Sequence, residues 1–295
     1  MKGKTYNIGL IQLNLNNSPG QNLKKCAHWI KLAAKEGAQV ICLPELCNSF
    51  YFCQREDTEN FKYAEPLYDT TFRTFSKLAA ELKLVLIVPF FEKRAAGIYH
   101  NSAYIINSDG KLAGLYRKMH IPDDPGYYEK YYFTPGDTGF KAFKTRYGKI
   151  GTLICWDQWF PEAARLMALQ GSEVIFYPTA IGWHPLEKEE YGQIQHDAWM
   201  TVQRGHSVAN GIFVAVANRV GYEQPYKEKD GIEFWGSSFI CGPQGEILAR
   251  ASHDKEEILM AKVDTAHIEE VRQNWPFFRD RRIDAFGDIL KRSVD

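Results

Sequence analysis

The stretches GAQVICLPE, at residues 37–45, and GSEVIFYPT, at residues 171–179, resemble each other, and they decide the fold of this chain. Each has a glycine, an apolar run and a proline at matching places, a pattern typical of a buried strand between turns. The first residues of the two stretches lie 134 positions apart, and the turn glycines Gly110 and Gly245 lie 135 apart. This repetition indicates two related α/β halves.

Strand and helix patterns alternate on both sides of these stretches. Apolar residues recur at helical spacing over residues 21–36 and 70–83, and Pro161 suits the first turn of a helix over residues 161–170. The other expected elements are strands over 6–13, 40–43, 84–91, 149–155, 173–177 and 212–218, a helix over 193–209, and hairpins over 103–117 and 239–250. Each half then has one sheet and one helical layer, and sheet-on-sheet packing buries both inner faces. We therefore expect an α/β fold, a four-layer α-β-β-α sandwich, with residues 1–295 in one domain.

Composition and charge exclude several classes of protein. The chain has 295 residues, with 36 Lys+Arg against 36 Asp+Glu, and this balance argues against a nucleic-acid-binding surface. The longest apolar run, residues 84–91, is too short to span a bilayer. Residues 1–7 lead directly into a strand pattern without a signal-peptide core. We expect neither secretion nor membrane insertion.

The cysteines give no sign of a disulfide framework or a metal site. Six of them are spread through the chain without a CxxC pair, and the histidines show no HExxH spacing. Zinc sites and disulfide scaffolds require such clustering. We expect reduced thiols in a cytoplasmic protein that needs no metal and no cofactor.

Superimposing the halves singles out residues whose counterparts differ chemically. Glu45 lies opposite Thr179, Lys118 lies opposite His253, and Cys155 ends the strand pattern of the second half. Taken singly, these residues also suit a solvated loop carboxylate, a surface cation and a buried structural thiol. Taken together they suit acyl transfer, in which a carboxylate accepts the thiol proton and an ammonium stabilises the oxyanion.

Three separated motifs resemble the nitrilase, or carbon-nitrogen hydrolase, superfamily: LPEL at 43–46, YRKMH at 116–120 and ICWDQWFPE at 154–162. The resemblance extends from about residue 6 to 286. It implies that Glu45 is the general base, Lys118 the oxyanion stabiliser and Cys155 the nucleophile. It also implies a second glutamate between the lysine and the cysteine, a place that Glu129 fills unless it is an ordinary loop carboxylate.

Residues 120–130, 155–165 and 177–182 further resemble the branch that hydrolyses N-carbamoylputrescine to putrescine, ammonia and carbon dioxide, a step of polyamine synthesis from agmatine. Relatives that bind a substrate carboxylate commonly carry an arginine three or four residues after the nucleophile. This chain has Gln158 and Trp159 there. We therefore expect a small cationic ureide as substrate.

Six residues are candidates for contact with the tail of such a substrate. An acidic pair suits the distal ammonium, and aromatic rings suit the tetramethylene chain or the ammonium. The candidates are Asp123, Asp124, Tyr127, Trp156, Trp183 and His184. Asp-Asp-Pro-Gly reads equally well as a turn, and Trp183 and His184 suit loop packing.

Other functions remain open on the sequence alone. The substrate can be another linear amide or ureide, such as β-ureidopropionate. The chain can also be the glutaminase part of a larger synthetase, although no nucleotide-binding segment follows, or a non-catalytic scaffold, although a scaffold would not require Glu45, Lys118 and Cys155 together. The resemblance also implies a homodimer or a larger homo-oligomer. The aromatic and charged stretch from Trp275 to the end of the chain, about residues 275–295, is a candidate interface or a solvated tail.

Overall fold

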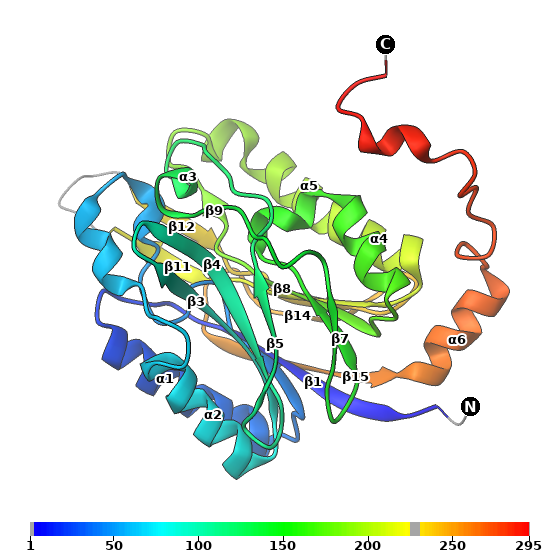
Figure 1. The fold of residues 1–295 in the computed structure, drawn as a ribbon, viewed down its shortest axis with the longest axis horizontal. Helices are drawn as coiled ribbons and strands as arrows, with labels where there is room; N and C mark the ends of the chain where they lie inside the picture. The colour runs from blue at the N-terminus through cyan, green and yellow to red at the C-terminus, as the bar shows by residue number, and fades with distance from the viewer. Residues whose placement is uncertain (1–2, 225–230, 295) are drawn as a thin grey trace.

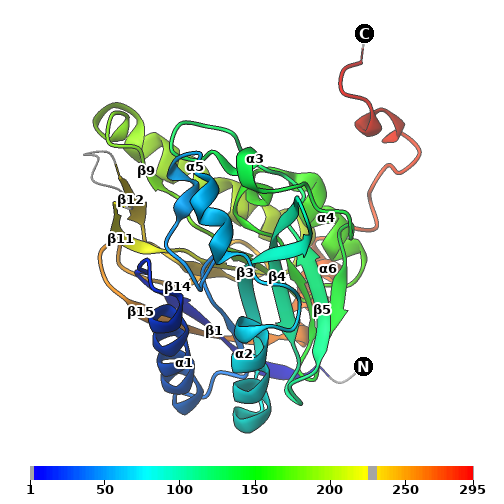
Figure 2. The same ribbon diagram turned by 60° about the vertical axis from the view of Figure 1, so that its left-hand side comes forward.

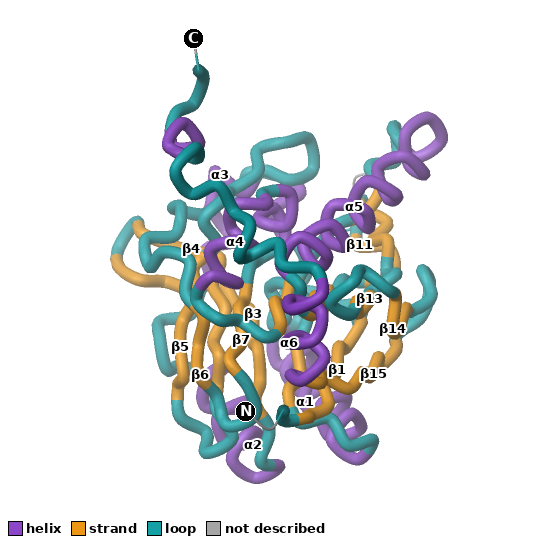
Figure 3. The backbone as a smooth tube through the Cα atoms, turned by 90° about the vertical axis from the view of Figure 1, so that its right-hand side faces the viewer, coloured by secondary structure: helices purple, strands orange, loops and turns teal. Residues whose placement is uncertain are grey.

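Two six-stranded sheets lie face to face in the computed structural model, which describes residues 3–224 and 231–294, and helices cover their outer faces (Figure 1). The first sheet has the order β15-β1-β2-β3-β4-β5 and the second the order β14-β13-β10-β8-β7-β6. Figures 2 and 3 show the same layers from two other sides, with α1 and α2 on the first sheet and α4 and α5 on the second. The expected four-layer α-β-β-α sandwich is confirmed.

The elements have the following bounds. The strands of the first sheet are β1 (Thr5–Gln12), β2 (Val40–Cys42), β3 (Val85–Ala95), β4 (Ile98–Ile106), β5 (Leu112–Arg117) and β15 (Glu257–Asp264). Those of the second are β6 (Ala142–Lys144), β7 (Lys149–Thr152), β8 (Val174–Pro178), β10 (Phe213–Ala217), β13 (Phe239–Cys241) and β14 (Ile247–Arg250). A third, small sheet contains β9 (Gly182–Trp183), β11 (Val220–Glu223) and β12 (Ile232–Trp235). The α-helices are α1 (Pro19–Lys35), α2 (Thr70–Leu82), α3 (Glu129–Tyr132), α4 (Pro161–Leu169), α5 (Lys188–Asn210) and α6 (Thr265–Asn274).

The two large sheets repeat one plan. Strands β1, β2 and β3 run parallel, as β7, β8 and β10 do. An antiparallel hairpin follows in each, β4–β5 in the first sheet and β13–β14 in the second. The opposite edges also match, because β15 pairs antiparallel with β1 and β6 pairs antiparallel with β7. The repeated stretches thus form β2 and β8, at equivalent places in the two halves.

A single apolar strand contributes side chains to two apolar layers, one between the sheets and one under the helices. Val85 and Ile87 on β3 point into the core between the sheets, whereas Leu86 and Val88 point toward α1 and α2. Successive side chains of a strand face opposite sides, so a strand buried on both faces is apolar throughout. On α1 the buried residues include Leu23, Cys26, Ile30 and Ala33, at the spacing of one helix face.

Several expected boundaries were wrong for physical reasons. Strand β7 ends at Thr152, and Cys155 begins a 3-10 turn, because the Ile154 N–H leaves the ladder for the Asp157 carboxylate while Leu153 and Ile154 stay apolar through burial. Helix α5 begins at Lys188, five residues before the expected start. Strand β4 begins at Ile98 rather than at 103, since its polar residues find buried partners at the junction of the sheets.

Helix α6, the edge strand β15 and the small third sheet were not expected. After α6, Phe278 still packs against the core, and the end of the chain then leads away from the rest, as the red segment in Figures 1 and 2 shows. In the described parts of the chain, no helix is long and apolar enough to cross a membrane.

Candidate active site

Cys155 lies in a sharp turn just beyond the end of β7. Its φ is +42°, in the left-handed region that residues other than glycine rarely adopt, and it begins the 3-10 turn Cys155–Trp159. The buried carboxylate of Asp157 holds this turn by accepting hydrogen bonds from the Ile154 N–H (2.9 Å) and the Tyr116 hydroxyl (2.7 Å). It also accepts one from the His120 N–H (3.0 Å). The nucleophile turn is therefore fixed to the segment that follows β5.

Lys118 lies directly after β5, between two carboxylates. Its Nζ donates to Glu45 Oε1 at 2.9 Å and to Glu129 Oε2 at 2.6 Å, and all three side chains are fully buried. Glu45 comes from the loop after β2, and Glu129 begins α3. A buried ammonium requires such partners, because an unpaired charge in the interior is very unfavourable.

Two further side chains orient the carboxylates. Asn101 on β4 donates to Glu45 Oε1 at 2.6 Å, and the Tyr51 hydroxyl donates to Glu129 Oε1 at 2.7 Å. The second oxygen of Glu45, Oε2, is buried and has no hydrogen-bond partner among the described residues. A buried carboxylate oxygen that accepts from no protein donor can accept a proton from a neighbouring group.

The charges of this cluster act on Cys155. Burial raises the pKa of the Cys155 thiol, the Glu45 carboxylate raises it further, and Lys118 offsets only part of this effect. Burial lowers the pKa of Lys118, but Glu129 and Glu45 more than compensate, so that pKa lies well above its usual value. Burial also raises the pKa of Glu129 to about 7, against the opposing effect of Lys118. The lysine stays charged while the thiol stays protonated, so the thiol needs a base before it can attack.

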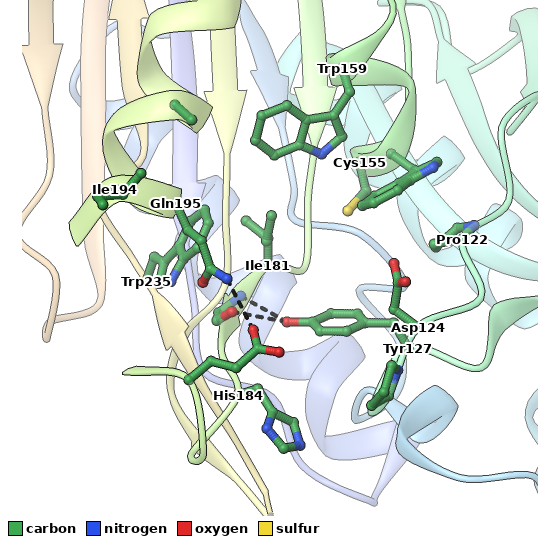
Figure 4. Close-up of a pocket in the computed structure, with 15 residues that line it drawn as sticks. Pro122, Asp124, Tyr127, Cys155, Trp159, Ile181, His184, Ile194, Gln195 and Trp235 are labelled. Carbon is green, nitrogen blue, oxygen red and sulfur yellow. Dashed lines mark hydrogen bonds between the residues drawn. The ribbon is translucent and has the colours of Figure 1, made fainter. Parts of the chain in front are cut away.

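A pocket of about 460 Å³ opens onto Cys155. Figure 4 shows the labelled side chains around it, with the sulfur of Cys155 facing the interior. Aromatic rings form much of the wall, two carboxylates and one imidazole supply charge or polarity, and none of the described lining residues is lysine or arginine. The lining includes Asp124, Tyr127, Trp156, Trp159, His184, Glu187 and Trp235.

Comparisons with known proteins place the chain in a family. Residues 7–273 match the family model described as carbon-nitrogen hydrolase. The chain belongs to the carbon-nitrogen hydrolase family. It is 44% identical to the N-carbamoylputrescine amidase of Solanum tuberosum over 292 residues, which cover 98% of this chain and 96% of that one. It is also 40% identical to the citrullinase of Francisella tularensis over 286 residues, which cover 97% and 98% of the two chains.

A solved structure agrees with these sequence matches. The carbon-nitrogen hydrolase from Helicobacter pylori G27 superimposes with a TM-score of 0.95 at 47% identity, covering 98% of this chain and 100% of that one. The resemblance to the nitrilase superfamily is thereby confirmed, and the protein is a hydrolase acting on carbon–nitrogen bonds.

The structure of this carbon-nitrogen hydrolase brings together Glu45, Lys118, Glu129 and the Cys155 turn, the residues singled out as catalytic candidates. Four of the six candidates for substrate contact line the pocket: Asp124, Tyr127, Trp156 and His184. The Tyr127 hydroxyl is fixed there, because it accepts from the Gly182 N–H at 3.0 Å.

The other two candidates lie outside the pocket lining. Asp123 and Asp124 are both exposed, and only Asp124 borders the pocket. Trp183 packs beside His196 and Trp235, and its indole N–H donates to the Gly192 carbonyl at 3.1 Å. It contributes to the packing behind the pocket instead.

Residues 158 and 159, where relatives that bind a carboxylate commonly carry an arginine, also differ in whether their side chains reach the pocket. Gln158 is fully buried and accepts a hydrogen bond from the Trp199 indole at 2.9 Å, whereas Trp159 lines the pocket. Only residue 159 presents its side chain to the pocket, and tryptophan there supplies an indole N–H but no cation to pair with a carboxylate.

Sequence reasoning missed several residues of the site. Glu187 and Trp235 line the pocket from segments that carry no motif, and Asn101 and Tyr51 orient the carboxylates. Asn101 had a signal, because His100-Asn101-Ser102 is a polar run within an otherwise apolar strand. In the described ranges, no group of His, Cys, Asp and Glu is arranged to hold a metal ion.

Proposed function

We propose that this enzyme is a cysteine-dependent amidohydrolase that converts N-carbamoylputrescine and water to putrescine, ammonia and carbon dioxide. One observation carries the choice of substrate: the pocket at Cys155 contains Asp124 and Glu187 but, among its described lining residues, no lysine or arginine. A cationic tail gains Coulomb energy in such a pocket, whereas a carboxylate tail finds no fixed cation. The N-carbamoylputrescine amidase relative supports the same substrate.

The chemistry follows from the cluster around Cys155. Glu45 Oε2 accepts the thiol proton, and the thiolate attacks the ureido carbonyl. The ammonium of Lys118 and the N–H of Trp156 stabilise the oxyanion. The tetrahedral intermediate expels ammonia with the proton held by Glu45, leaving a carbamoyl thioester. Water, activated by Glu45, then displaces the thiol, and the carbamic acid formed breaks down to putrescine and carbon dioxide.

The pocket walls hold the substrate for this reaction. The rings of Trp156, Trp159 and Tyr127 enclose the tetramethylene chain and exclude water from it. Glu129 keeps Lys118 in place through the 2.6 Å ion pair. No step requires a metal or a cofactor.

Hydrolysis of citrulline is a second candidate. The citrullinase relative supports it, and His184 lies in the same pocket, where a ring N–H can donate a hydrogen bond to the α-carboxylate of citrulline. Citrulline carries the same ureido group as N-carbamoylputrescine but ends in a zwitterion, so the two substrates test the charge of the tail directly.

A substrate panel tests the proposal. Ammonia release is measured with N-carbamoylputrescine, citrulline, N-carbamoyl-β-alanine and glutamine for the wild type and Cys155→Ala, with Cys241→Ala as a control at another buried cysteine. We expect kcat/KM to be highest for N-carbamoylputrescine, by about 100-fold over the carboxylate substrates. We expect at least about 10⁴-fold loss in Cys155→Ala alone. A preference for citrulline would select the second candidate, and full activity in Cys155→Ala would exclude the mechanism.

We also propose that the protein is a cytoplasmic homodimer or larger homo-oligomer that uses the C-terminal tail. Residues 275–294 carry exposed apolar side chains, among them Ile283, Ile289 and Leu290, and extended apolar surface of this kind usually becomes buried in an assembly. Sedimentation of the wild type and of Leu290→Asp tests this, because a monomeric wild type would contradict the proposal. All six cysteines are free and buried, which suits a reducing compartment.

A further inference from the structure

The loop after β2 carries two side chains of the catalytic cluster in a conformation that its own sequence does not favour. Glu45 begins this loop and Tyr51 ends it, and the residues between them form turns rather than helix or strand. Leu46, directly after Glu45, has φ +50°, in the left-handed region where a branched side chain is unfavourable. Contacts from elsewhere in the fold must therefore hold the loop.

Arg219 supplies those contacts. Its guanidinium is fully buried, and Nη2 donates to the carbonyls of Glu45 (2.9 Å), Leu46 (3.0 Å) and Ser49 (2.9 Å), while Nε donates to Glu45 at 3.2 Å. Arg219 directly precedes β11, in the half of the chain opposite to the loop. A planar guanidinium with its fixed fork of donors fixes several carbonyls at once in a way that a lysine ammonium does not.

Glu223 completes the arrangement. Its Oε1 accepts from Arg219 Nη1 at 2.7 Å, and its Oε2 accepts from the backbone N–H of Tyr51, also at 2.7 Å. The ion pair therefore reaches both ends of the loop. Because the Tyr51 hydroxyl donates to Glu129, the same pair is connected to both carboxylates that flank Lys118.

We propose that Arg219 and Glu223 are positioning residues, a buried ion pair that aligns Glu45 directly and Glu129 through Tyr51. The inference rests on the proposed function only in that Glu45 and Glu129 serve the chemistry of Cys155. Neither residue of the pair lines the pocket, so their effect is on the reaction of bound substrate rather than on its binding. The structural alternative is that the pair only stabilises the fold.

The first experiment compares Arg219→Lys with Arg272→Lys. Arg272 is a matched control, because its guanidinium also donates to a backbone carbonyl, that of Asn210, at 3.0 and 3.1 Å. It lies on α6 and not at the loop after β2. With the fastest substrate of the panel, Arg219→Lys should lower kcat by about 100-fold and leave KM within about threefold. Arg272→Lys should keep both constants near those of the wild type even where it melts earlier.

A second readout does not depend on the substrate. The rate at which iodoacetamide alkylates Cys155, followed by peptide mass spectrometry, reports how readily the thiol loses its proton. We expect alkylation to slow by about fivefold in Arg219→Lys and to stay unchanged in Arg272→Lys. A wild type that hydrolyses no member of the panel would overturn the proposed function, and this assay would still decide the role of the ion pair.

Tyr51→Phe provides the test should Arg219→Lys fail to fold, because it removes a single oxygen. It should lower kcat about tenfold without a comparable change in KM. Glu223→Gln should give a similar split between kcat and KM, because a neutral amide loses one of the two contacts of the carboxylate. Folded variants with wild-type kcat and alkylation rates would overturn the proposal and leave the pair with a structural role alone.

Discussion

The two halves of the molecule share a backbone plan and differ in what they place at equivalent points. After the first hairpin, Lys118 is fully buried between two carboxylates, whereas after the second, its counterpart His253 has a side chain that is 66% exposed. After the repeated strands β2 and β8 come Glu45 and Thr179, and the two meet, since the Glu45 N–H donates to the Thr179 carbonyl at 3.4 Å. The repeated strands bring the two sheets together at this point. Single residues that differ between the halves decide the chemistry there.

The difference between Lys118 and His253 shows what a buried charge requires. Lys118 extends the β4–β5 ladder, because its N–H donates to the Asn101 carbonyl at 2.8 Å, and this pairing directs its side chain between Glu45 and Glu129. Among the described residues no such pair of carboxylates faces His253, whose acidic neighbour is the exposed Asp254. A charged side chain is stable in the interior only where groups of opposite charge are already in position beside it.

Of the substitutions that test the difference between the two halves, one at Lys118 should have the largest effect. Lys118→Met keeps the side chain's length but leaves Glu45 and Glu129 buried without their cation. We expect kcat/KM to fall about 1,000-fold through loss of oxyanion stabilisation and the free energy of unfolding to fall by about 3–5 kcal/mol. His253→Met, at the equivalent point, should change neither kinetics nor melting. Steady-state ammonia release and thermal melts measure both, and equal effects of the two substitutions would contradict the functional asymmetry of the halves.

A smaller effect concerns the carboxylates of the pocket. Asp124→Asn removes a charge from the wall contributed by the first half of the chain, so KM for N-carbamoylputrescine should rise about 10–30-fold with little change in kcat. Glu187→Gln removes the charge from the second half, where Gln195 already donates to that carboxylate at 3.0 Å, and should raise KM less. The neighbour that does not border the pocket is the control: Asp123→Asn should leave KM unchanged. A larger effect from Asp123 than from Asp124 would show that the tail lies elsewhere.

The smallest effect is a pH dependence at Glu129, the second carboxylate bound to Lys118. Its pKa is about 7 in the folded protein against 4.5 as its ordinary value, because burial disfavours the charged form. The stability from the protonated group is complete below about pH 4.5 and is lost as the pH rises through 7. The wild type should therefore lose roughly 2–3 kcal/mol of unfolding free energy relative to Glu129→Gln between pH 4.5 and 7. Denaturant unfolding at both pH values measures this difference.

Glu36→Gln, at an exposed glutamate after α1, is the control for that experiment. It should follow the wild type across the same pH range. Parallel curves for the wild type and Glu129→Gln would contradict the raised pKa, because they would mean that Glu129 binds its proton equally well in the folded and unfolded states.

Much of the fold was predictable because local patterns coincide with tertiary roles. The apolar runs of β2, β3, β8 and β10 are strands because both faces are buried, and the periodicity of α1 and α2 matches the sheet that they cover. Strand β15 was missed although residues 258–261 form an apolar run, because its partner β1 is about 250 residues away and no local signal marks that pairing. The extra turn between β7 and Cys155 was missed because burial makes coil residues as apolar as strand residues.

The sequence by itself determined the layered fold and the residues of the candidate chemistry, because glycines, apolar periods and the three motifs are local features of the chain. Tertiary structure alone decided which of two adjacent residues reaches the pocket: Asp124 and not Asp123, Trp159 and not Gln158. It also decided that Arg219, far from any motif, holds the loop of Glu45. The physical reason is that a side chain's direction and the partners of a buried charge depend on segments distant in sequence, and those meet only once the two sheets have packed.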